Sequence, residues 1–95
     1  MMKAQRERLF EDYVAFIRDD TRGRYGFCSL GNLYRAVAQP RGLSFGVFHD
    51  HLRELVRDRK IRLHPWTQAA YLIPADDEAC WIISGQEIKA YVELL

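Results

Sequence analysis

The stretch that decides the fold runs from Phe27 to His64 and reads FCSLGNLYRAVAQPRGLSFGVFHDHLRELVRDRKIRLH. A short apolar strand around Phe27 precedes a helix predicted over residues 30–38, and the turn 39–42 with its Pro and Gly ends that helix. A second helix is predicted over 44–59. The alternating residues 60–64 then predict a strand. Two helices joined by a tight turn therefore lie between two strands.

Apolar residues at helical spacing support both helices, and a serine stands ahead of each. The hydroxyls of Ser29 and Ser44 are predicted to accept from a free backbone N–H of the first turn. The expected buried stripes are Leu30, Leu33, Tyr34 and Val37 in the first helix, and Phe45, Phe48, Leu52, Leu55 and Val56 in the second.

A longer amphipathic helix is predicted over residues 3–18. Its apolar stripe is wide and consists of Leu9, Phe10, Tyr13, Phe16 and Ile17. Such a stripe has two interpretations: it faces the core of its own domain, or one flank also packs against a second copy in a homodimer. The sequence leaves both open.

The last third of the chain is harder to interpret. Pro74 followed by acidic residues predicts a short helix over 74–81, because proline suits the first helical position and acids suit the positive end of the helix dipole. A last strand is predicted over 87–94, with Ile88, Ala90, Val92 and Leu94 on one face. These elements predict a single α+β domain spanning residues 1–95.

The charges are unevenly placed along the chain. The formal net charge of the 95 residues is only +1. Residues 27–64 carry seven basic and three acidic side chains, for +4, whereas residues 65–95 carry one basic and five acidic side chains, for −4. The molecule is therefore expected to be dipolar, with its basic surface near the second helix.

No pattern indicates an enzyme, a cofactor or a metal site. His49 and His51 point about 200° apart on a helix and cannot share one ion. Cys28 and Cys80 are the only cysteines, and their spacing predicts two buried free thiols in a cytoplasmic protein. There is no N-terminal apolar run of the length that a signal peptide or a membrane span needs.

The order of elements resembles the winged helix-turn-helix superfamily of small bacterial DNA-binding domains. Residues 29–37, 43–45, 51–56 and 61–63 carry this resemblance. It implies a three-helix core, a recognition helix in the major groove and a β-hairpin wing near the backbone; many members bind only proteins. Here the wing is expected to be elaborated, because about twenty residues with their own helix separate the two long strands.

The helix 44–59 is then the expected reading helix. Its basic residues and neighbours would contact phosphates, and Val47 would touch a thymine methyl. Acidic Asp50 and Glu54 on the exposed face fit base readout poorly. The candidate nucleic-acid-binding residues are Arg35, Arg41, Ser44, Val47, His51, Arg53, Arg57, Arg62 and His64.

Two functions follow from these observations. The first is a DNA-binding or transcription-regulatory protein, acting as a dimer because one small module makes few phosphate contacts. The second is an adaptor whose winged helix binds another protein through the acidic hairpin or through exposed aromatics among Trp66, Tyr71 and Trp81. Convergence of the basic residues on one surface would favour the first function, and a continuous apolar patch the second.

Overall fold

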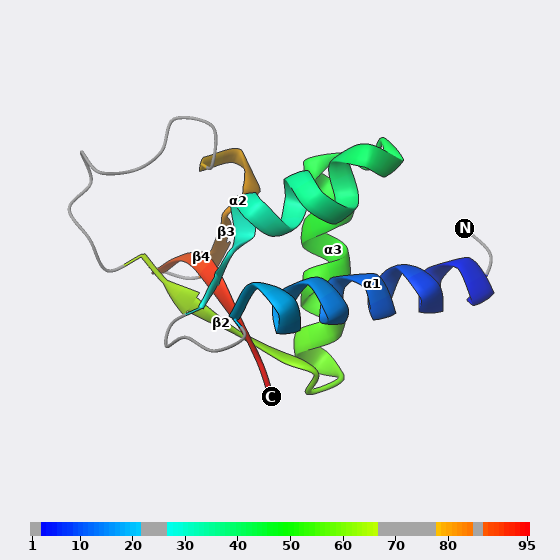
Figure 1. Ribbon diagram of the computed structural model, residues 1–95. Helices are drawn as coiled ribbons and strands as arrows, with labels where there is room; N and C mark the ends of the chain where they lie inside the picture. The colour runs from blue at the N-terminus through cyan, green and yellow to red at the C-terminus, as the bar shows by residue number, and fades with distance from the viewer. Residues whose placement is uncertain (1–2, 22–26, 67–77, 85–86) are drawn as a thin grey trace.

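The computed structural model describes residues 3–21, 27–66, 78–84 and 87–95 (Figure 1). Its helical elements are α1 (Lys3–Thr21), α2 (Leu30–Leu33), a π-helical turn (Tyr34–Ala38), a 3₁₀ turn (Gln39–Arg41), α3 (Phe45–Arg57) and a second 3₁₀ turn (Glu78–Cys80). Its strands are β1 (Cys28–Ser29), β2 (Ile61–Pro65), β3 (Ile82–Ser84) and β4 (Glu87–Leu94). The class is α+β, as predicted.

Strand β4 organises the antiparallel sheet, because it pairs with each of the other described strands. The order is β1-β4-β2, with Cys28 opposite Val92 and Ile61 opposite Leu94, and β3 pairs with the first residues of β4. The predicted alternation in β4 holds for Ala90 and Val92, which are buried. Ile88 departs from it and is 43% exposed, since it lies beyond the register shift at His64 and Pro65.

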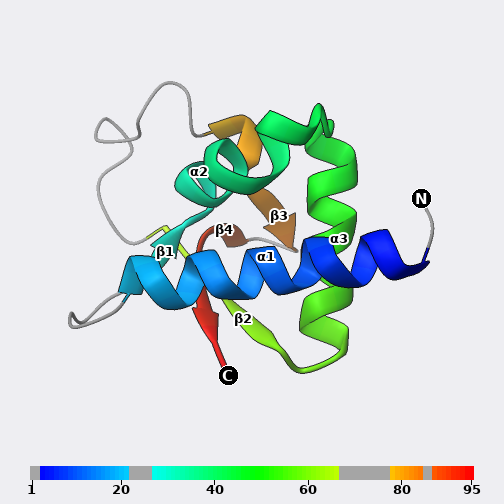
Figure 2. The same ribbon diagram turned by 45° about the vertical axis from the view of Figure 1, so that its right-hand side comes forward.

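The core lies between α1, α3 and the sheet. Figure 2 shows α1 running across α3 and the sheet, with α2 beside it. Fully buried side chains come from each layer, with Tyr13 and Ile17 on α1 and Phe48 and Leu52 on α3. Phe10 and Phe16 are only partly buried against this core, so the buried part of the α1 stripe is narrower than its apolar residues alone suggest.

Both predicted serine caps are present. The Ser29 hydroxyl accepts from the Asn32 N–H at 3.1 Å, and the Ser44 hydroxyl accepts from the Val47 N–H at 3.2 Å. Each hydroxyl satisfies one of the backbone donors that the first turn of a helix leaves without a partner. The caps fix the starts of α2 and α3, and α3 ends within two residues of its predicted end.

The helix predicted over 30–38 is not regular. After Leu33 the chain widens into the π-helical turn, in which the Gln39 N–H donates to the Tyr34 carbonyl. This turn directs Tyr34 toward α3, where its hydroxyl donates to the Leu43 carbonyl at 2.8 Å and its ring lies 5.2 Å from that of Phe48. The wider turn therefore fixes how the two helices pack.

Two residues predicted to be buried on α3 are exposed. Phe45 is 40% exposed, because it stands in the first turn and packs only one side against the Tyr34 ring, at 4.5 Å. Val56 is 39% exposed, because it faces a groove rather than the core. In contrast, Glu54 was expected in solvent but is half-buried, where it forms an ion pair with Arg6 of α1.

Other elements also differ from those predicted, in their boundaries or in their presence. α1 continues to Thr21, whose hydroxyl donates to the Ile17 carbonyl at 2.8 Å. Residues 74–77 of the helix predicted over 74–81 lie outside the described residues, and the described part is a 3₁₀ turn that ends at Cys80. Strand β3 was not predicted, because a three-residue apolar run has no periodicity of its own.

Gly42 provides a test of the turn before α3. It has φ +70°, and a Cβ placed there meets nothing within 4 Å, so only backbone strain opposes Gly42→Ala. We expect that change to lower the free energy of unfolding by about 1 kcal/mol. Gly46→Ala on α3, where an added Cβ would meet only the Ser44 hydroxyl oxygen at 3.9 Å, is the matched control and should raise it by about 0.5 kcal/mol. Urea denaturation of both variants measures this, and equal effects would contradict the assignment.

Candidate nucleic-acid interface

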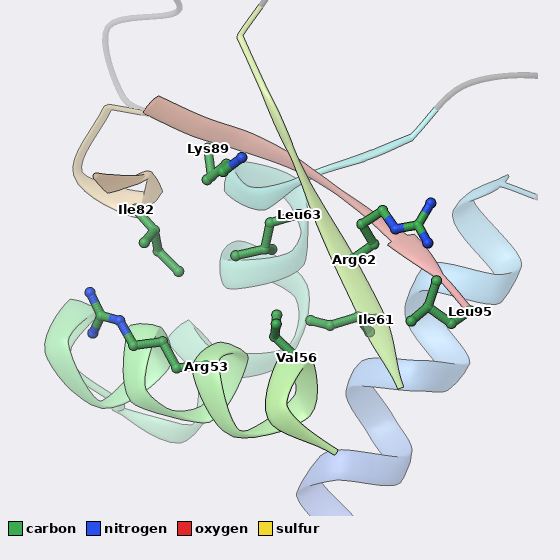
Figure 3. A pocket seen from close by; sticks show the side chains of 8 residues that line it. All are labelled: Arg53, Val56, Ile61, Arg62, Leu63, Ile82, Lys89 and Leu95. Carbon is green, nitrogen blue, oxygen red and sulfur yellow. The ribbon is translucent and has the colours of Figure 1, made fainter. Parts of the chain in front are cut away.

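A groove of about 530 Å³ lies between the C-terminal half of α3 and the sheet (Figure 3). Arg53 and Val56 line it from α3, and the other lining side chains come from β2, β3, β4 and the residue after β4. They are Ile61, Arg62, Leu63, Ile82, Lys89 and Leu95. We call this surface the basic groove.

Charge on the basic groove has one sign. Figure 3 shows Arg53 and Lys89 on the same side of β2 as Leu63, whereas Arg62 leaves β2 on the opposite side. None of the described side chains that line it is acidic. Three cationic side chains from three different elements therefore line this groove, two of them over its apolar floor and Arg62 at the edge of β2.

Among the described residues, the ion pairs of the arginines near the basic groove are weak or absent. Arg53 contacts Asp50 at 3.4 Å with both side chains more than half exposed, and such pairs are weak. Arg57 lies on the same helix, is 72% exposed and reaches Asp58 only at 3.9 Å. Glu93 lies opposite Arg62 in the ladder, but its carboxylate contacts His64. Arg53, Arg57 and Arg62 therefore stay accessible to an anionic partner.

His51 was predicted to contact DNA, and this prediction is wrong. Its ring is only 8% exposed and lies between α3 and α1, with Nδ1 3.3 Å from the Tyr13 hydroxyl. Burial raises the pKa of Tyr13 and lowers the pKa of His51. The phenol therefore keeps its proton and can donate to the neutral imidazole. His51 is a core residue because α1 crosses α3 at this turn.

Arg41 is turned away from the basic groove. Its guanidinium pairs with Asp12 of α1 and also donates to the Val37 carbonyl at 2.7 Å. Arg35 donates to the Asn32 side chain at 3.0 Å, on the helical segment before the turn. Neither arginine lines the basic groove. The predicted set of phosphate contacts therefore divides, and these two do not join Arg53 and Arg62.

His64 is engaged on the outer face of the sheet. Its Nε2 lies 3.0 Å from a Glu93 carboxylate oxygen, and the Phe27 ring stacks on its imidazole at 3.8 Å. Trp66 continues this row, since it stacks on Tyr91 and lies 5.1 Å from the Trp81 ring. Trp81 is 7% exposed, so it covers the sheet rather than forming an exposed patch. Tyr71 lies outside the described residues.

The N-terminal half of α3 carries the remaining predicted residues, Ser44 and Val47. The Ser44 hydroxyl is used as the helix cap, and Val47 is 38% exposed beside Phe45. Asp50 follows on the same exposed surface. This end of α3 thus presents apolar and acidic groups and lacks the Arg, Asn or Gln that pair with base edges.

Lys89 was missed as a site residue. Lys89 is the one basic residue in the acidic segment 65–95, so the charge count along the sequence did not single it out. Lys89 lies opposite the buried Ile82 in the ladder and so shares its face of the sheet, and only the pairing of β4 with β2 and β3 brings it into the basic groove. That long-range pairing was not predicted from the residues.

No metal-binding cluster occurs among the described residues. His49 and His51 diverge, as their spacing predicts: His49 Nε2 lies 3.0 Å from the Cys80 carbonyl, whereas His51 faces Tyr13. Cys28 and Cys80 are free and buried, as predicted. Within the part of the chain that the structure describes, every helix is too short or too polar to cross a membrane.

The two histidines predict a pH dependence of stability. Burial lowers the pKa of both His49 and His51 below the ordinary value of 6.5. The unfolded chain then binds more protons as the pH falls below 6.5. The contribution of the two neutral rings to the free energy of unfolding is therefore fully present above pH 6.5. It decreases as the pH falls toward the pKa of the histidines in the folded protein. Urea midpoints at pH about 7.5 and about 5.5 measure this loss. The H49Q/H51Q variant should lose most of this difference between the two urea midpoints, and an unchanged difference would contradict the prediction.

Comparison of the chain with known protein families, curated proteins and solved structures gives no match.

Proposed function

We propose that this chain is a winged-helix domain that binds double-stranded DNA through the basic groove and the adjoining C-terminal half of α3. The contacts are mainly to phosphates. The binding is therefore largely independent of sequence.

The layout supports the first part of the proposal. A helix, a short strand, two helices joined by a tight turn and a returning β2–β4 pair follow one another in the order expected of a winged helix. The strand order β1-β4-β2 agrees with that arrangement. Between β2 and β4 the described residues hold the 3₁₀ turn and β3, which would belong to an elaborated wing.

The convergence of Arg53, Arg62 and Lys89 around one groove carries the second part of the proposal. These cations come from α3, β2 and β4, the elements that would flank a duplex in this layout. Arg57 extends the basic surface along α3, and Lys60 and Arg59 are exposed at the turn that follows. A row of phosphates is the polyanion that matches a one-sign surface of this length.

The exposed residues of α3 support binding that does not recognise a particular base sequence. Phe45 and Val47 offer at most apolar contact with thymine methyl groups, and Asp50 repels phosphates unless Arg53 neutralises it. Specificity, which base-edge hydrogen bonds supply, would then be low, while affinity would depend strongly on salt.

An adaptor function is the second candidate, and the floor of the basic groove favours it. Val56 and Leu95 are 39% and 61% exposed there, and DNA phosphates would not make favourable contacts with such apolar side chains. A protein segment that combines apolar and acidic side chains would match both the floor and the rim.

Fluorescence anisotropy of a labelled mixed-sequence duplex separates the two functions. At about 50 mM salt we expect binding that weakens steeply by about 200 mM, with a slope of log K against log salt of about −3 to −4, one unit per phosphate contact. Two duplexes of different sequence should bind alike. Absence of binding at the lower salt concentration would refute the DNA proposal and leave the adaptor function.

A further inference from the structure

A second groove, of about 470 Å³, lies on the other side of the molecule's helical layer, between α1 and the C-terminal end of α3. Phe10, Val14 and Leu55 form its apolar floor. Its charged lining residues are Glu7, Glu11, Arg18, Asp58 and Lys60. We call it the mixed-charge groove.

The α1 side of this groove is a single stripe of the helix. Glu7, Phe10, Glu11, Val14 and Arg18 recur at the three- and four-residue spacing that places side chains on one face. The buried residues Leu9, Tyr13 and Ile17 lie on the neighbouring face, turned to the core. The stripe therefore borders the core but lines an open groove of the domain instead of being covered by it.

Charge along the stripe is ordered. Both acids stand in the N-terminal half of α1 and the arginine stands near its C-terminal end, with Val14 between them. Within the described residues, Glu7, Glu11 and Arg18 form no ion pair, in contrast to Arg6 and Asp12 of the same helix, which pair with Glu54 and Arg41. The stripe thus presents separated, unpaired charges of both signs around an apolar centre.

Such a pattern is complementary to itself. If two copies of α1 pack antiparallel about a two-fold axis near Val14, Glu11 of each helix lies opposite Arg18 of the other, and the two Val14 side chains meet at the centre. The basic groove lacks this property, because a surface with only positive rim charges repels a second copy of itself.

We propose that the mixed-charge groove is the site at which a second copy of this chain binds, in a two-fold symmetric dimer held by antiparallel α1 helices. Glu11 of each chain pairs with Arg18 of the other. The proposal does not depend on DNA binding, since it uses a different groove and the side chains of α1, with only Lys60 at the border of both surfaces. A dimer of this kind places two basic grooves on one molecule.

Sedimentation equilibrium over a wide range of protein concentration tests the proposal. We expect the unmodified chain to dimerise and Arg18→Glu to weaken the dimer by at least about tenfold, because two pairs become repulsive at once. Arg8→Glu is the matched control: Arg8 is exposed on α1 but does not line the mixed-charge groove, so it should leave the dimer unchanged.

A mixing experiment tests the pairing itself. Glu11→Arg alone should also weaken the dimer, whereas an equimolar mixture of Glu11→Arg and Arg18→Glu chains should form a mixed dimer, because opposite charges then face each other. Circular dichroism confirms that each variant is folded. A monomeric unmodified chain, an Arg18→Glu dimer as tight as that of Arg8→Glu, or failure of the mixture to associate would each overturn the proposal.

Discussion

Phe48→Ala is expected to lower the free energy of unfolding by about 3–5 kcal/mol. Phe48 is fully buried, and its ring lies 5.9 Å from that of Tyr13 on α1 and 5.2 Å from that of Tyr34 in the π-helical turn. Removing it leaves a cavity where three helical segments meet, and tight packing around the ring limits collapse into that space. A domain of this size has only about 5–15 kcal/mol of stability to lose.

Urea denaturation followed by circular dichroism measures this loss, and Phe45→Ala is the matched control. Phe45 is the same residue type on the same helix, but it is 40% exposed and packs on one ring. Its removal should cost about 1 kcal/mol. Equal losses in the two variants would show that α3 does not present Phe48 to the core.

Arg53→Ala combined with Arg62→Ala is expected to weaken DNA binding by roughly a hundredfold at about 0.1 M salt. Each phosphate contact contributes close to one unit to the salt slope, which is roughly tenfold in affinity at that concentration. Both side chains line the basic groove, from α3 and from β2, and neither lies in the core. The salt slope should fall by about two units for every duplex sequence tested.

Arg8→Ala combined with Arg35→Ala serves as the control for that double variant. It removes the same charge from exposed positions outside the basic groove, so it separates contact with phosphates from a loss of net charge. If both double variants lower the salt slope equally, the basic groove is not where DNA binds.

Helix caps, the long strand and the two long helices were predicted correctly from the sequence, because each depends on residues close together in the chain. Ser29 and Ser44 act as helix caps because a cap needs only its own first turn. Residues 87–94 form β4 because alternation is a local property. α1 and α3 were also recognised from their helical spacing. In each case the information lies within a few residues of the feature.

The errors arise where two elements meet. Helical spacing cannot tell which flank of α3 another helix will cover, so His51 was assigned to DNA and Val56 to the core, and each assignment was wrong. Arg41 was counted as a phosphate contact because its partner Asp12 stands 29 residues away in the chain. Lys89 was missed for the same reason, since its neighbours in the basic groove come from distant segments.

The central position of β4 has a consequence for how the chain folds during synthesis. Each of the other described strands is hydrogen-bonded to β4. Cys28 of β1 pairs with Val92, and Ile61 of β2 pairs with Leu94, so both pairings form only after β4 has been synthesised. A nascent chain that has emerged only as far as β3 holds its helices but no sheet partner for β1 or β2. Their backbone N–H and C=O groups stay open to other chains until residues 87–94 leave the ribosome. The sheet therefore closes in one late step, because β1, β2 and β3 all lack their described strand partner until β4 is available.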